Sequence, residues 1–284
     1  MNQKRKKWMF IILLLLICIV WIIWANTALE TNYYTISNEK LPTSFHGYRI
    51  ALITDLHNCE IGENNIRLLK ILQETDPDMI AIVGDIVDCY HTDISISLNF
   101  ANQAATIAPT FYVTGNHESF IKEYDQLEVS LSNGGVSILH NEVLKLEQNG
   151  EYIQLIGLDD PSFEVDYFTG DTTTRIDTVL EQIDISNDTF SLLLSHRPEL
   201  FDIYVKHHVD LALSGHAHGG QFRFPFIGGL YTPNQGIFPK YDSGLYSENG
   251  TDMIVSRGIG NSRFPIRFNN RPEVIIIELQ TNTH

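Results

Sequence analysis

The chain has 284 residues, a formal net charge of −16 and 43% hydrophobic residues. This length and hydrophobic fraction suit one globular domain with a short additional segment. The acidic balance argues against nucleic acid as the main partner, because clustered Lys and Arg bind phosphate backbones. It does not exclude an enzyme that handles phosphate, since bound metal ions can supply positive charge locally.

The N-terminal segment differs in composition from the rest of the chain. A basic cluster, Lys4 to Lys7, precedes an uncharged apolar run from Trp8 to Ala25. At ~1.5 Å per residue, a helix of about 18 residues reaches roughly 27 Å, which is enough to cross a hydrocarbon core. Because basic residues remain on the cytoplasmic side, we predict a single-pass cell-membrane protein with a cytoplasmic N-terminus and an extracellular domain. A cleaved signal peptide is the alternative, although residues 25–28 form a poor cleavage site.

The predicted organisation has four parts. They are a basic cytoplasmic N-terminus at 1–7, a transmembrane signal anchor at 8–25, a juxtamembrane spacer at 26–45 that leads into an edge strand, and a main domain at 46–284.

Short runs rich in Val, Ile and Leu alternate with helical patterns along the main domain. The predicted strands are 48–54, 79–83, 110–113, 152–158, 190–194, 209–213, 253–256 and 274–279, and the predicted helices are 64–74 and 94–107. Continuous apolar strands that alternate with helices indicate an α/β domain whose sheet is covered on both faces. The segment 221–246 is rich in Gly, Pro and aromatic residues and is typical of long loops.

Polar residues with metal-ligand chemistry stand at the carboxyl ends of these strands. They are Asp55, His57, Asp85, Asp88, Asn116, His117, His196, His216 and His218. Each pair alone is common turn chemistry, but α/β sheets place ligand sites beyond the carboxyl ends of their strands. Imidazole and oxygen ligands without thiolate favour Mn, Fe or Zn, among which the sequence does not choose. The combination predicts a metal site.

The same residues carry a resemblance to a known family. The motifs are Asp55-x-His57, Gly84-Asp85-x-x-Asp88, Gly115-Asn116-His117-Glu118, Ser195-His196 and Gly215-His216-x-His218. From Tyr48 to Leu279 the chain resembles the calcineurin-like metallophosphoesterases. The segments Ser195 to Glu199 and Gly219 to Gln221 are most similar to the membrane-linked bacterial phosphodiesterase branch. The resemblance implies a four-layer α/β/β/α sandwich catalytic domain, here preceded by one N-terminal transmembrane helix.

The resemblance also implies a role for each ligand. Two divalent or trivalent ions are expected, one held by Asp55, His57 and His218, the other by Asn116, His196 and His216, with Asp85 between them. A bridging carboxylate offsets the repulsion of two cations at the ~3.5–4 Å spacing of two-metal sites.

The implied mechanism is attack of a metal-bound hydroxide on phosphorus. His117 is expected to assist the leaving group and Asp88 to orient His117 and favour its charged form. Protein phosphatases of the superfamily have an arginine where this chain has Cys89. A protein phosphatase is therefore disfavoured, and phosphate binding is expected from the metals, His117 and Arg197.

We therefore predict a phosphoesterase that hydrolyses a phosphodiester or diphosphate bond of a membrane-associated or lipid-linked substrate, such as a lipid headgroup. A non-enzymatic scaffold on the same fold and a cell-surface nuclease remain as alternatives. The aromatic residues of 222–246 are expected to pack over the sheet edge or to form an apolar wall for a lipid tail.

Two pairs of residues have simpler expected roles. Cys59 and Cys89 form either one disulfide or, as we expect, two unpaired thiols. Asp159 and Asp160 are predicted to be turn or cap residues.

Overall fold

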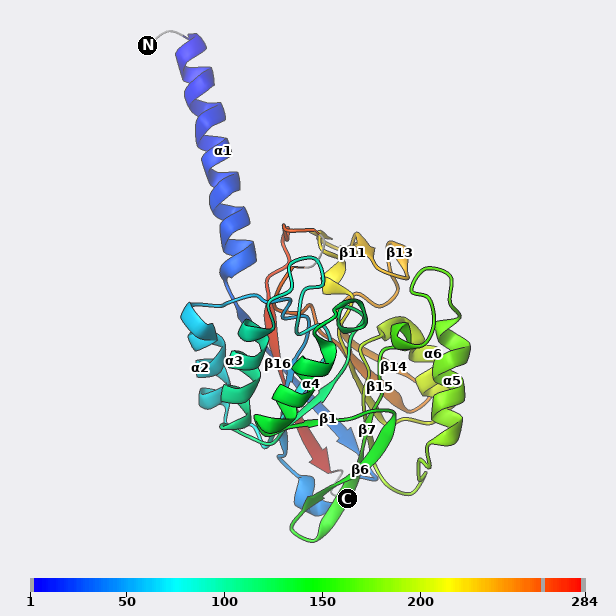
Figure 1. Cartoon of the computed structure of the whole chain (residues 1–284). Coiled ribbons are helices and arrows are strands. Elements are labelled where there is room, and N and C mark those ends of the chain that lie inside the picture. The colour runs from blue at the N-terminus through cyan, green and yellow to red at the C-terminus, as the bar shows by residue number, and fades with distance from the viewer. Residues whose placement is uncertain (1–2, 262–263, 282–284) are drawn as a thin grey trace.

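The computed structural model describes residues 3–261 and 264–281. Helix α1 (Gln3–Thr27) extends away from the folded domain (Figure 1). Its mean hydropathy reaches 2.9, and Ala25 is the one buried residue of this fully described helix. A helix of 25 residues is ~37 Å long. Helix α1 is therefore apolar enough and long enough to cross a membrane.

The domain contains a first sheet with the strand order β1-β16-β2-β3-β4-β5. Its strands are β1 (Glu30–Asn38), β2 (Arg49–Ile53), β3 (Met79–Val83), β4 (Thr110–Val113), β5 (Val136–Ile138) and β16 (Glu273–Thr281). Strands β2 to β5 are parallel, β16 is antiparallel to β2, and β1 is parallel to β16.

A second sheet has the order β14-β15-β9-β8-β7-β6. Its strands are β6 (Glu142–Gln148), β7 (Glu151–Gly157), β8 (Ser191–Leu194), β9 (Leu211–Ser214), β14 (Gly244–Glu248) and β15 (Thr251–Val255). The central strands β7, β8, β9 and β15 run parallel, and antiparallel hairpins close both edges.

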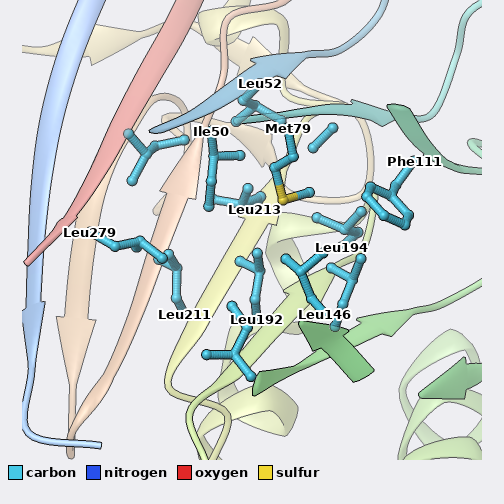
Figure 2. Packing of buried hydrophobic residues seen from close by; sticks show 14 of the residues in the cluster. Ile50, Leu52, Met79, Phe111, Leu146, Leu192, Leu194, Leu211, Leu213 and Leu279 are labelled. Atoms are coloured by element: carbon cyan, nitrogen blue, oxygen red, sulfur yellow. The ribbon is translucent and has the colours of Figure 1, made fainter. Parts of the chain in front are cut away.

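The two sheets pack face to face because their strands alternate between two buried faces. In β2, Ile50 and Leu52 join a core shared with Leu192 and Leu194 of β8, as Figure 2 shows. The intervening residue Ile53 faces the opposite way and packs beneath the helices. This period of two, with both faces apolar, explains why the strands read as continuous hydrophobic runs.

Helices cover the outer faces of the sandwich on either side (Figure 1). They are α2 (Ile66–Thr75), α3 (Ile94–Ala105) and α4 (Tyr124–Asn133) on the first sheet, and α5 (Thr172–Gln182) and α6 (Phe201–Lys206) on the second. Within the described residues the architecture is the four-layer α/β/β/α sandwich that the sequence predicted, preceded by an apolar N-terminal helix.

The segment predicted as long loops contains short antiparallel hairpins. They are β10 (Arg223–Phe224) with β11 (Gly228–Gly229), and β12 (Tyr231–Thr232) with β13 (Gly236–Ile237). The range 26–45, predicted as a spacer, contains the edge strand β1. Ala28 and Leu29 separate α1 from this strand. In the described part of the chain, Cys59 and Cys89 are unpaired thiols, as expected.

Candidate metal centre

Side chains from both sheets meet beyond the carboxyl ends of their strands. Asp55 follows β2, and its Oδ1 lies 3.4 Å from His218 Nε2 and 3.8 Å from His196 Nε2. Asp85 follows β3, and its Oδ2 lies 3.2 Å from His196 Nε2 and 3.6 Å from His57 Nε2. One buried cluster therefore unites residues from segments that are far apart in the sequence.

Within this cluster, ligand atoms form groups that lie within 4.8 Å of one another. The groups are Asp55 with His57 and His218, Asp85 with His196 and His216, and His57 with Asp88 and His117. The first group is one predicted metal set, and the second contains His196 and His216 of the other set together with Asp85, which also lies near His57. The structure thus brings together the side chains predicted to be ligands.

The donor atoms fit metal binding. Among the described residues, His196 Nε2 and Asn116 Oδ1 are buried without a hydrogen-bond partner. His196 Nδ1 lies 2.9 Å from the Val83 carbonyl, which only accepts, so a neutral His196 keeps a lone pair on Nε2. His57 Nε2 and His218 Nε2 are 3.1 Å apart. Lone pairs and carboxylates that converge in a buried site are stabilised by bound cations.

Protonation states in the cluster also suit metal ligands. Burial raises the pKa of Asp85, but His196 and His117 outweigh it, so the pKa lies well below its usual value. Burial lowers the pKa of His218 to about 3 and lowers that of His216 strongly. Burial lowers the pKa of His196. The nearby carboxylates of Asp85 and Asp55 outweigh burial and raise this pKa to about 10. His196 therefore releases a proton when it binds a metal.

His117 lines the cavity beside the cluster with a defined orientation. Its backbone N–H donates to Asp85 Oδ1 over 2.8 Å, and Cys89 N–H donates to its Nδ1 over 3.0 Å. Asp88 Oδ1 lies 3.4 Å from the same Nδ1. Burial opposes protonation, but Asp85 and Asp88 raise the pKa of His117 to about 11. In the charged ring both nitrogens carry protons, and in the neutral ring Nδ1 accepts from Cys89, so Nε2 carries a proton in both forms.

The cavity has a volume of about 560 Å³. Its lining includes residues of the buried cluster and an aromatic set, namely Tyr90, Phe120, Tyr167, Phe168 and Tyr231. Cavities with convergent polar groups and apolar walls are typical of substrate sites.

Arg197, predicted to bind substrate, is fully buried. Its Nη2 donates to Asp160 Oδ1 and Ser162 Oγ over 2.9 and 2.8 Å. Its Nη1 donates to Asn234 Oδ1 over 2.9 Å and lies 3.3 Å from His216 Nε2. Arg197 is absent from the described residues that line the cavity. The geometry directs its guanidinium to His216 and Asn234, two residues that line the cavity.

Several supporting residues were missed from the sequence. Asp160 caps a short turn, as expected, because its Oδ1 accepts Ser162 N–H, but it also forms a buried pair with Arg197. Glu118 is buried and accepts backbone N–H groups from Gly115 and Asp85 over 2.6 and 2.9 Å. Its place as the last residue of the Gly115-Asn116-His117-Glu118 motif was the signal that could have identified it.

Among the missed residues, Arg267 is the one farthest along the sequence from the predicted ligand motifs. It is fully buried, and its Nη2 lies 3.5 Å from His218 Nδ1. Its Nη1 donates to the Arg257 carbonyl over 2.8 Å. No motif in the sequence surrounds Arg267, so no pattern signalled this contact.

A buried cluster of carboxylates, imidazoles and an amide at strand ends, open to a cavity, defines a metal-dependent hydrolase centre. Comparison with known proteins identifies the family: the model of the calcineurin-like phosphoesterases matches residues 48–220. The chain belongs to this family and is a metal-dependent phosphoester hydrolase.

Curated relatives show the same similarity over most of the chain. The uncharacterized metallophosphoesterase YkuE of Bacillus subtilis is 29% identical over 263 residues, which cover 89% of this chain and 86% of YkuE. An uncharacterized metallophosphoesterase of Helicobacter pylori is 32% identical over 81% of this chain and 59% of its own length. A transmembrane protein with a metallophosphoesterase domain from Bos taurus is 28% identical over 85% of this chain and 55% of its own length.

Among solved structures, the phosphopantetheinyl hydrolase PptH from Mycobacterium tuberculosis is 12% identical, with a TM-score of 0.46 over 76% of this chain and 91% of PptH.

Proposed function

We propose that this protein is a membrane-anchored, two-metal phosphodiesterase that hydrolyses a phosphodiester or diphosphate bond of a membrane-associated substrate. The observation that carries the proposal is the convergence of the predicted ligands on one buried cluster beside the cavity that His117 lines. We assign one metal to Asp55, His57 and His218, the other to Asn116, His196 and His216, and the bridging position to Asp85. Filled ligand positions argue against a non-enzymatic scaffold.

Bound Mn, Fe or Zn ions would supply Lewis acidity and lower the pKa of water at this centre. The residues of the chain then orient the substrate and move the proton. The charged His117 ring donates its Nε2 proton to the leaving oxygen, while its Nδ1–H faces the Asp88 carboxylate, which orients the ring. The aromatic wall of the cavity offers an apolar surface beside the leaving group.

We assign Arg197 as a positioning residue. Nη2 of its guanidinium donates to Asp160 and Ser162. Nη1 lies beside His216 and Asn234. Burial is the larger cause of the lowered pKa of His216, and the nearby Arg197 guanidinium lowers this pKa further. The imidazole therefore stays neutral for metal binding. A direct contact between Arg197 and the substrate phosphate stays a prediction from the sequence.

The anchor in this proposal is α1, which is 25 residues long and has exposed apolar side chains along its length. Lys4 to Lys7 at its start favour a cytoplasmic N-terminus, and Trp21 and Trp24 near its other end suit the opposite interface. The domain then lies outside the cell. Digestion of intact cells with a protease should cleave the domain, whereas protection until lysis would contradict this topology.

The catalytic proposal is tested on the full chain in detergent, loaded with Mn. We expect bis(p-nitrophenyl) phosphate to be hydrolysed faster than p-nitrophenyl phosphate. Asp85→Asn removes the bridging charge and should lower turnover by at least about 10²-fold, as the loss of a central electrostatic group does. Asp188→Asn, which makes the same change on an exposed loop, should leave turnover at the parental rate.

Each outcome separates parts of the proposal. Failure of the folded protein to bind Mn, Fe or Zn would refute the metal centre. Faster hydrolysis of the monoester would refute the diesterase assignment but preserve the phosphoesterase. Equal turnover by Asp85→Asn would refute the assigned bridging role.

A further inference from the structure

The end of α1 is fastened to the domain by a specific set of polar contacts. Asn26 Oδ1 accepts the backbone N–H of Arg267 over 2.9 Å, and Asn26 Nδ2 donates to the Arg267 carbonyl over 3.1 Å. The Arg271 guanidinium lies 4.8 Å from the ring centroid of Trp24, and its Nε donates to the Ala28 carbonyl over 2.8 Å. The domain is therefore held at a defined orientation to α1.

The loop that binds Asn26 carries exposed apolar side chains toward the same end of the molecule. Phe264 is 54% exposed, and its ring lies 5.4 Å from that of Phe222, which joins this loop to the β10–β11 hairpin. Phe226, between β10 and β11, is fully exposed. Figure 1 shows β11 and β13 at the end of the domain from which α1 rises.

We name this surface the late-loop face. It is defined by the exposed side chains of Phe224, Phe226, Ile227, Ile237, Phe238 and Phe264. Clustered large apolar side chains at this exposure mark an interaction surface rather than the ordinary surface of a soluble domain.

The charge distribution identifies what this surface contacts. The chain contains 35 acidic residues, yet residues 211–241 and 253–272 contain none. Of the described basic residues in these segments, Lys240 is exposed, whereas Arg267 is buried and Arg223, Arg257 and Arg271 pair with acidic residues. An apolar face built from segments without acidic residues, on a protein of net charge −16, avoids repulsion from an anionic lipid surface.

The late-loop face also adjoins the catalytic cavity. Tyr231, 55% exposed, lies on β12 and lines the cavity, as do Pro233 and Asn234 in the same hairpin. Leu230 N–H donates to the Phe222 carbonyl over 2.8 Å, so the β12 segment is joined to the β10 segment. A contact between this face and a bilayer would hold the mouth of the cavity at the level of the lipid headgroups.

We propose that the late-loop face inserts into the surface of the membrane that α1 spans, as a second contact that brings the metal centre to phosphodiester bonds of membrane lipids. The proposal rests on the membrane anchor proposed above. It assigns the substrate to lipids whose phosphate lies in the headgroup layer while the hydrocarbon chain stays in the bilayer.

The test uses the full chain reconstituted in vesicles of phosphatidylcholine and phosphatidylglycerol with brominated acyl chains, which quench nearby tryptophan. Phe226→Trp adds a tryptophan at the centre of the face. Tyr152→Trp is the matched control, because Tyr152 is an exposed aromatic residue on β7, in the hairpin with β6. The signal of Trp8, Trp21 and Trp24 is subtracted with the parent protein.

We expect the emission of the tryptophan added by Phe226→Trp to shift to shorter wavelength and to lose intensity in brominated vesicles, while the control emission does neither. Equal behaviour of the two variants would overturn the proposal. A blue shift that is already present in detergent, with no quenching by bromine and with dimers in solution, would assign the face to a second copy of the chain and also overturn it.

Two further measurements separate this proposal from the ones on which it rests. Alkaline extraction of the vesicles tests whether α1 spans the bilayer, independently of the face. Hydrolysis of bis(p-nitrophenyl) phosphate by Phe226→Trp in detergent should equal that of the parent, because Phe226 lies outside the catalytic machinery. Loss of quenching with retained hydrolysis and retained insertion would refute the late-loop contact alone.

Discussion

Positive φ angles recur among the metal-centre residues. They are 51° at Asp55, 46° at His57, 52° at Asp85, 63° at His216 and 47° at His218. Such backbone angles at residues other than glycine cost of order 1–3 kcal/mol each and persist only where the surroundings hold them. The predicted ligands therefore depend on neighbouring residues that fix their loops.

Glu118 is one of these neighbours. Its buried carboxylate accepts N–H groups from Asp85 and Gly115, which lie in two different ligand loops. Glu118→Gln replaces one acceptor oxygen with an NH₂ group that faces a backbone donor. We expect the free energy of unfolding to fall by about 1–3 kcal/mol, the cost of an unsatisfied buried polar group. Metal affinity should fall about 10–100-fold, as when a supporting partner of a ligand is lost.

Urea unfolding and metal titration of the detergent-solubilised protein measure both effects. Glu123→Gln makes the same chemical change at an exposed position five residues along the chain and should alter neither quantity. Parental metal affinity in Glu118→Gln would show that the loops hold their shape without this carboxylate.

At the scale of the element, the turn after β3 has little room. Gly84 has a φ of +76°, and a Cβ there would lie 2.4 Å from His196 Nδ1. We expect Gly84→Ala to displace the His196 ring and to reduce the amount of metal bound per chain. Overpacking of this kind typically costs about 1–3 kcal/mol of stability.

Gly150 provides the matched control for this prediction. Its φ is +85°, but a Cβ there would meet nothing within 4 Å, so Gly150→Ala carries the backbone strain without the clash. Metal content should be unchanged in Gly150→Ala and reduced in Gly84→Ala. Equal metal content in the two variants would show that His196 tolerates the added methyl group.

Elements differed in how well the sequence predicted them. The runs at β3 and β4 were located because both faces of these strands are buried and apolar. Helix α5 was not predicted, because it begins with three threonines, which have a modest helix propensity. It is stabilised by Ile176, Val179 and Leu180, which are buried against the sheet. The short hairpins β10 to β13 have strands of two residues, and such pairing depends on tertiary contacts rather than on a local pattern.

At the scale of the whole molecule, His140 connects the two halves of the sandwich. Its Nε2 lies 2.6 Å from Glu128 in α4, on the first sheet, and its Nδ1 lies 3.0 Å from Asp159, which follows β7 of the second sheet. Hydrogen bonding to Asp159 outweighs partial burial and raises the pKa of His140 to about 9. The contact therefore contributes to stability while the ring is charged.

The sign of the pH dependence follows from this shift. The pKa in the folded state exceeds the unfolded value of ~6.5, so the stabilisation is complete below about pH 6.5 and is lost as the pH rises toward 9. His140→Gln removes it. We expect the difference in unfolding free energy between parent and His140→Gln to be largest at pH 6 and to shrink by pH 9.5. A constant difference across this range would contradict the assignment.

The residue pattern alone predicted an α/β sheet covered on both faces, and the four-layer sandwich could be predicted only through the resemblance that the strand-end motifs carry. The contacts between segments that are distant in the sequence could not be predicted. Arg267 lies beside His218 only because the loop before β16 passes the metal centre and binds the end of α1 at Asn26. A loop of this kind has no periodicity, so its path is decided by the packed structure.

The junction of α1 with the domain has a consequence for substrate choice. Ala28 and Leu29 are all that lies between the helix and strand β1, and Asn26 and Trp24 are clasped by the loop before β16. If α1 spans the membrane as proposed, so short a connection fixes the distance of the proposed metal centre from the bilayer surface. Under the proposed anchoring, the protein selects phosphodiesters by their distance from the bilayer surface as well as by their shape. An identical bond in a longer headgroup, farther from the bilayer, does not meet the metal centre.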